Sequence, residues 1–425
     1  MYSRRTKRTK IMTEGKYKVS GVMEFNEEEK KEQVAPNAME RFNEKGADTI
    51  ETSINCDCVC KTSSLRNNKN ENRFSRSNMI ITSGGTRSKL NVFIATCSAN
   101  IAAVAAGCVL TWSSPTIAKV TKHGERILVT IDQGAWLSSL VAVGASLGPF
   151  VASSVVNKIG RKWTIISDMF LFLASWSILA YCNLIYSLYF ARILAGIAVG
   201  IVFTTVPLYV AEIAPMDLRG TLGSLMQFFL CLGFLMSYII GPYTSYLTLI
   251  IICATIPLFC ILTFIWVPES PHFLLNKNKQ QEALDALQWF RGHQERILMQ
   301  TEITDILASA DDIKHNKGSI KTLFSEKGSR KALYYSCALA FFQQASGINA
   351  VLFYTETIFE TTGSSLPSSI SAIIIGIVMT LAAGIAAPAA KIFGVKNLLC
   401  FSAIGEAMSL VITNNIIRSL NRIKP

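Results

Sequence analysis

The chain has 425 residues, of which 50% are hydrophobic and only 16% charged, and its formal net charge is +12. So little charge is atypical of a soluble protein of this length. A positive balance would suggest nucleic-acid binding in a soluble chain, but here the apolar residues form long blocks and the charges lie between them, so no nucleic-acid partner is expected.

Residues 1–88 are rich in Lys, Glu, Asn, Ser and Thr and poor in aromatic residues. This composition predicts a disordered, basic tail. Cys56, Cys58 and Cys60 form a C-x-C-x-C cluster in it, which could be lipidated or bind a soft metal. Because no second ligand cluster lies nearby, an incidental thiol cluster is favoured and no metal site is predicted.

Nine apolar blocks follow, each close to the ~20 residues that a membrane-spanning helix needs. We therefore predict an all-α membrane protein. The nine predicted spans are Leu90–Leu110, Trp136–Val156, Thr164–Cys182, Tyr186–Val210, Thr221–Ile240, Leu247–Val267, Leu333–Phe359, Ile370–Ala390 and Leu398–Ile417.

Basic residues are distributed unevenly between the connections. Residues 1–89 contain 18 Lys/Arg against 12 Asp/Glu, and Pro268–Arg330 adds nine Lys/Arg, whereas the connections after the third, fifth and seventh spans contain none. This asymmetry follows the positive-inside rule. It predicts a multi-pass protein of the plasma membrane with its N-terminus and its central loop in the cytoplasm.

The chain divides by composition into four parts: a tail (1–88), a six-helix bundle (89–267), a helical cytoplasmic linker (268–330) and a three-helix bundle (331–425). Within the linker, Gln280–Arg291 has the pattern of a weak amphipathic helix. Asn157–Lys162 after the second span is echoed by Lys391–Lys396 after the eighth. Such an echo suggests two related halves, a plan that many transporters share. A full second half would need six spans, so we expect the sequence to be C-terminally truncated.

The seventh span contains the run Phe341–Val351, in which Gln343, Gln344 and Asn349 flank a Ser346-Gly347 step. Amides are costly in hydrocarbon unless they find partners. They carry both donors and acceptors, which suits the hydroxyl groups of a sugar in a wet cavity. Helix–helix hydrogen bonding is the alternative. On a straight helix Asn349 would lie well round from Gln344, and a break at Ser346-Gly347 would turn it inward.

Three further motifs occur at predicted span ends. They are Gly160-Arg161-Lys162, the run Pro207–Pro215 followed by Arg219-Gly220, and Pro268-Glu269-Ser270-Pro271. With these motifs the chain resembles the sugar porter family of the major facilitator superfamily, from about Leu90 onward. Thr111–Pro115 is similar to the arthropod branch of facilitated trehalose and hexose transporters.

The resemblance implies a fold of twelve helices in two bundles, of which about nine are present, around a cavity that opens alternately to each side. It implies that the sugar is bound by residues of the fifth and seventh spans: Gln227, Gln343, Gln344, Asn349 and Tyr354. For Gln227 the alternative is an interhelical hydrogen bond. No cofactor is implied, and no nucleophile motif such as G-x-S-x-G indicates an enzyme.

The resemblance also implies a cytoplasmic gate whose opposite charges pair across the two halves when the cavity faces outward. Its residues are Arg161, Lys162, Glu212, Arg219 and Glu269. Single exposed pairs are weak, but a network could bias a two-state equilibrium. Several positions depart from the family pattern, so the gate is expected to be weaker or differently tuned: Asn157, Lys391 and Val395 in the two loops, and His272 in place of an arginine.

Arg192 lies near the start of the fourth span, where it is either buried and functional or directed to the membrane surface. In proton-coupled relatives an acid on the first span lies beside this arginine, whereas Leu90–Val120 contains no Asp or Glu. We therefore predict a uniporter of trehalose or a hexose. A proton–sugar symporter is one alternative, and Asp168 and Glu406 are isolated acids for which a span-end or helix-pairing role is favoured. A non-transporting sugar sensor or truncated partner subunit is another.

Overall fold

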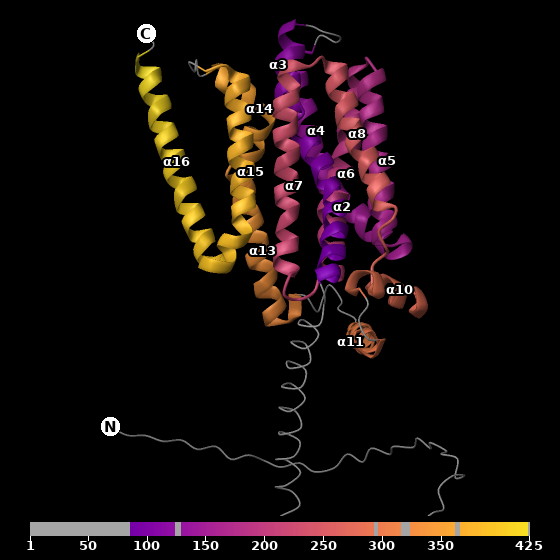
Figure 1. Cartoon of the computed structure of the whole chain (residues 1–425). Helices are drawn as coiled ribbons and strands as arrows, with labels where there is room; N and C mark the ends of the chain where they lie inside the picture. The colour runs from indigo at the N-terminus through magenta and orange to yellow at the C-terminus, as the bar shows by residue number, and fades with distance from the viewer. Residues whose placement is uncertain (1–85, 124–128, 293–295, 316–323, 362–365, 424–425) are drawn as a thin grey trace, which may run out of the picture. The chain divides into compact units, whose positions relative to one another are not determined.

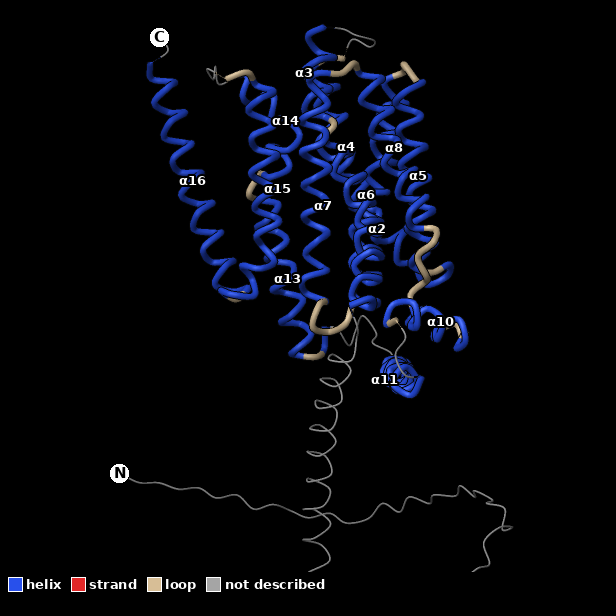
Figure 2. Tube along the Cα trace, in the orientation of Figure 1, coloured by secondary structure: helices blue, strands red, loops and turns tan. Residues whose placement is uncertain are grey.

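The computed structural model describes residues 86–123, 129–292, 296–315, 324–361 and 366–423, which are helical with no strand among them (Figures 1 and 2). The predicted tail and its cysteine cluster lie outside these residues, except for the last three residues of the tail, which begin the first described helix. Nine of the described helical segments are long and apolar enough to cross a membrane. The prediction of nine spans is therefore confirmed for the described part of the chain.

The first six spans begin with α2 (Thr86–Thr111), which is followed after one residue by α3 (Ser113–His123). The others are α4 (Ile131–Ile159), α5 (Arg161–Tyr181), α6 (Ile185–Ile213), α7 (Arg219–Ile240) and α8 (Tyr246–Phe264). A short 3₁₀ turn, Gly241–Tyr243, separates α7 from α8. Within the bundle α2 packs on α6, α7 and α8, and α6 also packs on α4 and α5.

Paired glycines bring α4 and α6 close together. Gly144 and Gly148 on α4 face Gly196 and Gly200 on α6, each pair four residues apart on its own helix. A Cβ atom added at Gly148 would lie 2.5 Å from the Gly200 Cα atom. Membrane helices pack through such small residues because lipid supplies no hydrophobic force between them. The glycine spacing therefore fixes how closely these two spans approach.

Three more helices follow the sixth span: α9 (Pro271–Asn276), α10 (Gln280–Arg291) and α11 (Arg296–His315). The predicted helix Gln280–Arg291 is α10, with the same ends. Its buried residues form one face, and the Asn91 side chain of α2 donates a hydrogen bond to the Trp289 carbonyl (2.7 Å). The linker helices are thus attached to one end of the bundle, here called the α10 end (Figure 1). The opposite end, which carries α3, is called the α3 end.

The later spans comprise α13 (Lys327–Ala345), α14 (Ile348–Thr361), α15 (Ser368–Phe393) and α16 (Val395–Ile423). The seventh span is thus two helices, and it starts at Lys327 rather than at the predicted Leu333. α15 packs on α7, and α14 packs on α15 and α3. By contrast, α13 has no buried residue, and none of the residues in the described span of α16 is buried. Contact between the later spans and the six-helix bundle is therefore made mainly through α14 and α15.

Candidate functional site

The seventh span is broken at Ser346-Gly347, as the sequence predicts. Gly347 has φ +78°, in the left-handed region that favours glycine, and its N–H donates to the Gln344 carbonyl (3.2 Å). Asn349 is the second residue of the next helix, and its side-chain amide donates to the Gln344 Oε1 atom (2.5 Å). The break thus brings together two amides that a straight helix would have separated.

The remaining predicted sugar-binding residues differ in how they are placed. Gln343 is exposed in the last turn of α13. Tyr354 is half-buried in α14 and has a non-helical backbone (φ −125°, ψ 17°) that kinks the helix. Gln343 and Tyr354 therefore do not lie on one straight helix, because the span is broken at Gly347 and kinked at Tyr354.

Gln227 is exposed on α7, and its amide contacts the Cys231 Sγ atom of the same helix (3.7 Å). Eleven residues further along, the Tyr238 hydroxyl donates to the Leu352 carbonyl of α14 (3.1 Å). At ~100° per residue, Gln227 and Tyr238 lie on the same face of α7 within ~20°. Gln227 is therefore on the α7 face that meets the seventh span, although its side-chain hydrogen bond among the described residues is to Cys231 and not to the α13–α14 amides.

Direct contacts between α14 and the six-helix bundle occur toward the α3 end. Tyr238 also hydrogen-bonds the Thr355 hydroxyl (3.1 Å), and the Glu356 N–H donates to the Ser114 hydroxyl on α3 (3.0 Å). α13, which extends toward the α10 end, buries none of its residues. The hydrogen bonds between α14 and the six-helix bundle therefore lie toward the α3 end, whereas α13, whose last turn carries the exposed amides, buries none of its residues (Figure 1).

A charged network lies at the α10 end, formed by Arg161, Lys162, Glu212, Glu269 and Ser270. Arg161 makes an ion pair with Glu212 (NH2–Oε1 2.8 Å) and lies over the Phe273 ring (5.3 Å). The Glu212 carboxylate also accepts a hydrogen bond from the Ser270 hydroxyl. The network therefore joins the start of α5, the end of α6 and the segment before α9.

Glu269 belongs to the network through hydrogen bonds from backbone N–H groups. Its carboxylate accepts from the N–H groups of Arg161 (3.0 Å), Lys162 (3.0 Å) and Ser270 (2.9 Å). Burial raises the pKa of Glu269, while these three N–H groups and the Arg161 charge oppose the shift. Glu269 thus caps the N-terminus of α5, where backbone donors are otherwise unpaired. Gly160 makes this possible, because a Cβ atom there would collide with the Glu269 carboxylate.

The predicted gate residues are thus brought together except for Arg219, which is exposed at the start of α7. Among the described residues, Arg161, Glu212 and Glu269 make their contacts within the first six spans and the segment that follows them. Pairing across the two halves, which is expected when the cavity faces outward, stays a prediction. Sequence reasoning missed Arg291, which pairs with Glu302 (2.9 Å) and donates to the Ile213 carbonyl (2.9 Å).

Arg192 is fully buried rather than directed to the membrane surface. Its guanidinium donates to the Leu137 carbonyl of α4 (2.9 Å), the Val109 carbonyl of α2 (3.1 Å) and the Ser113 hydroxyl of α3 (2.8 Å). It also lies 4.8 Å from the centre of the Trp112 ring. The residue is held by neutral acceptors and an aromatic face, and it ties α6 to three other helices where α2 ends.

The two isolated acids differ in burial. Asp168 on α5 is 1% exposed, and neither carboxyl oxygen has a hydrogen-bond partner among the described residues. Among the described residues, no hydrogen bond of the Asp168 side chain supports a role in helix pairing. Glu406 is exposed on α16.

The stability of the protein is expected to depend on pH through His272, which lies near the charged network. Burial, together with the Arg219 and Arg161 charges, lowers its pKa below the ordinary 6.5, against the opposing effect of Glu212 and Glu302. The unfolded chain therefore binds a proton more readily, so the free energy of unfolding should fall as pH drops below 6.5 toward the folded-state pKa. Thermal unfolding at pH 8 and 5.5 should show a larger drop in Tm for the wild type than for His272→Asn. Equal drops would contradict this role.

Comparisons with known proteins agree with this architecture. The "Sugar (and other) transporter" family model matches residues 78–423. The chain is 30% identical over 318 residues to the facilitated trehalose transporter Tret1 of Apis mellifera ligustica, covering 75% of this chain and 63% of that protein. For the Bombyx mori Tret1 the identity is 31% over 284 residues, covering 67% and 56%. The chain thus spans about three fifths of the length of these relatives.

Among solved structures, the partially occluded inward-open xylose transporter XylE from E. coli aligns with a TM-score of 0.59 at 21% identity, covering 71% of this chain and 74% of that one. XylE bound to 6-bromo-6-deoxy-D-glucose, described as a proton:xylose symporter of the major facilitator superfamily, aligns with a TM-score of 0.60 at 22% identity, covering 71% and 70%. The protein is therefore a multi-pass helical membrane protein with the major facilitator fold. It belongs to the sugar transporter family, whose members are transporters rather than enzymes.

Proposed function

We propose that this chain contributes the sugar-binding part of a facilitative transporter for trehalose or a hexose. The observation that carries the proposal is the broken seventh span, where Gln343, Gln344 and Asn349 gather around Gly347 in an otherwise apolar helix. Each side-chain amide has both a hydrogen-bond donor and an acceptor, so it can bind a sugar hydroxyl in either sense. Gln227 on the facing side of α7 would complete the site with Tyr354, and the names of the Tret1 relatives support trehalose as the substrate.

Transport would proceed by alternating access. The contacts of α14 with Tyr238 and Ser114 keep the α3 end joined, so sugar would enter or leave at the α10 end in this state. Opening the α3 end requires these hydrogen bonds to break. Closing the α10 end would bring α13 to the charged network, where Arg161, Lys162, Glu212, Arg219 and Glu269 would serve as the gate. A ligand with differential affinity for the two states would shift their populations.

We further propose the plasma membrane as the location and the cytoplasm as the side of the N-terminus and the α10 end. The basic residues of 1–89 and Pro268–Arg330 support this orientation. On this arrangement, residues 89–267 form the first bundle, 268–330 a cytoplasmic linker and 331–425 part of the second bundle.

Uniport is proposed because the Arg192 guanidinium is held by neutral groups among the described residues. Its three hydrogen bonds there go to carbonyl and hydroxyl oxygens, and residues 86–123, which form α2 and α3, contain no Asp or Glu. A proton carrier is therefore missing beside this arginine. If the protein is instead a symporter, the buried acid Asp168 on α5 is the candidate proton carrier.

The experiment is uptake of labelled trehalose and labelled glucose into cells or proteoliposomes containing the chain, with and without a protonophore. We expect uptake that equilibrates and is insensitive to the protonophore. Accumulation above equilibrium that collapses with the protonophore would overturn uniport. Absence of saturable uptake of either sugar would contradict the transport proposal itself.

A further inference from the structure

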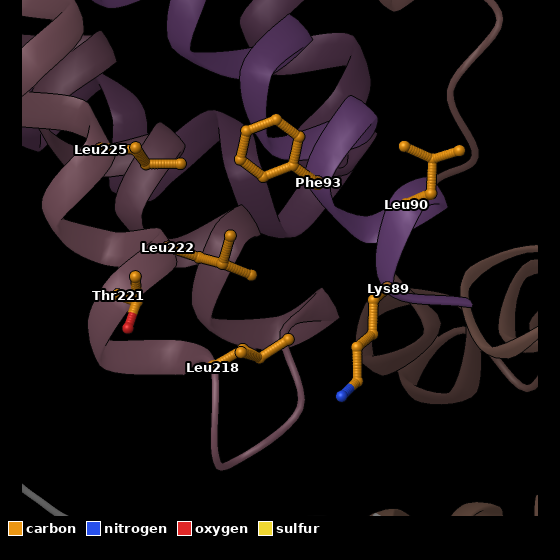
Figure 3. Close-up of a pocket in the computed structure, with 7 residues that line it drawn as sticks. All are labelled: Lys89, Leu90, Phe93, Leu218, Thr221, Leu222 and Leu225. Carbon is orange, nitrogen blue, oxygen red and sulfur yellow. The ribbon is translucent and has the colours of Figure 1, made fainter. Parts of the chain in front are cut away.

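An apolar groove lies between the first two turns of α2 and the first two turns of α7, at the α10 end (Figure 3). It has a volume of about 420 Å³ and is lined by Lys89, Leu90, Phe93, Leu218, Thr221, Leu222 and Leu225. Five of these seven side chains are hydrocarbon. A hollow with such walls suits a flexible apolar chain rather than a polar solute.

The groove faces away from the proposed sugar site. Leu225 lines it, whereas Gln227 lies two residues along α7 and therefore ~200° round the helix. Tyr238, on the same face as Gln227, meets α14. The groove therefore does not open onto the proposed sugar site. Two of its apolar residues, Leu90 and Phe93, are 53% and 48% exposed. In a membrane-spanning bundle, apolar side chains exposed in this way contact lipid.

Positive charge lies at the mouth of the groove. The Lys89 ammonium group extends beyond the apolar side chains in Figure 3. Arg219 is exposed beside Leu218 at the start of α7, and Asp217 is the acidic neighbour that opposes it in part. The N-terminus of α7 has no side-chain cap, so its N–H groups add partial positive charge. This end of the bundle thus attracts a negatively charged headgroup.

Thr221 also lines the groove. Its hydroxyl oxygen is buried and has no hydrogen-bond partner among the described residues, so it is not accessible to an occupant of the groove. The lining therefore combines an apolar floor with a cationic mouth.

We propose that this groove binds one acyl chain of an anionic phospholipid from the leaflet at the α10 end, with its phosphate beside Lys89. Charge complementarity favours this occupant over a neutral lipid, because a basic residue near a membrane surface attracts anionic headgroups. The site is separate from sugar binding. The experiment that tests the lipid site uses no sugar, so its result does not depend on whether the transport proposal is correct.

The test is retention of lipid by the purified full chain in mixed micelles, measured by mass spectrometry of the intact protein with phosphatidylserine or chain-matched phosphatidylcholine. We expect one phosphatidylserine to be retained with about fivefold higher affinity than phosphatidylcholine, the effect of one basic residue. Lys89→Gln should remove this preference. Lys158→Gln, which changes an exposed lysine at the same end of α4, should preserve it.

A second pair of variants tests the groove itself. Thr221→Trp and Leu225→Trp should fill it and lower the retention of both lipids, while a wild-type elution profile in size exclusion confirms that the variants fold. Equal retention of the two lipids by the wild type would overturn the proposal. So would unchanged retention in both tryptophan variants, the result expected if the chain's own N-terminal segment or annular lipid accounts for binding.

Discussion

Replacement of Arg192 by leucine is expected to abolish the accumulation of folded protein in the membrane. The guanidinium is fully buried and donates to acceptors on α4, α2 and α3. Its removal leaves the Leu137 and Val109 carbonyls and the Ser113 hydroxyl without their partner. Each buried acceptor left without a partner costs about 1–3 kcal/mol, so the loss of three hydrogen bonds is a large share of the stability of a typical protein.

Size exclusion of fluorescently tagged protein, with a Tm for whatever fraction elutes as monodisperse, measures this effect. Arg192→Lys should fall between the wild type and Arg192→Leu, since lysine keeps the charge but loses the planar fork. Arg330→Leu is the matched control, because Arg330 is exposed in the first turn of α13. A wild-type Tm for Arg192→Leu would show that the three hydrogen bonds do not stabilise the junction of α2 and α3.

Substitution of Gly148 by alanine is expected to have the second largest effect. The added methyl carbon would lie 2.5 Å from the Gly200 Cα atom and the Ile197 carbonyl oxygen of α6. Both are backbone atoms, so α4 and α6 would have to separate and would lose packing along their length. Overpacking of this kind costs about 1–3 kcal/mol, and we expect about 3 kcal/mol because no flexible side chain can move aside.

Gly223→Ala is the matched control for this substitution. Gly223 is also in a membrane helix, but nothing lies within 4 Å of a Cβ atom placed there. Alanine should therefore be neutral or should stabilise α7 by about 0.5–1 kcal/mol through its higher helix propensity. Thermal unfolding of both variants in the same detergent gives the comparison. Similar Tm values for the two alanine variants would refute the close approach of α4 and α6.

The number and position of the spans could be predicted from the sequence because each span is an apolar run bounded by polar residues. The break of the seventh span was also predictable, since Ser346-Gly347 interrupts an apolar run with a residue that readily adopts positive φ. The Tyr354 kink was not, because nothing in that residue type disfavours a regular helix. The single-residue step between α2 and α3 at Trp112 was equally invisible in the apolar pattern.

The charged residues of the network could be located at span ends, but their partners could not be predicted. Glu269 binds three backbone N–H groups, and backbone donors are available at every helix start. The burial of Arg192 was left open because its partners are carbonyls on α2 and α4, which carry no side-chain signal. The paired glycines of α4 and α6 were visible as a four-residue spacing, yet their pairing is a property of the packed helices.

The central claim is that the amides at the broken seventh span bind sugar. The most direct measurement is equilibrium binding of labelled trehalose and labelled glucose to the purified chain and to Gln343→Ala, with Gln288→Ala in the exposed face of α10 as the control. Loss of one amide should raise the Kd of the better ligand about two- to tenfold, the worth of a hydrogen bond, while the control stays at the wild-type value. Saturable sugar binding that is identical in Gln343→Ala and in the wild type would contradict the claim.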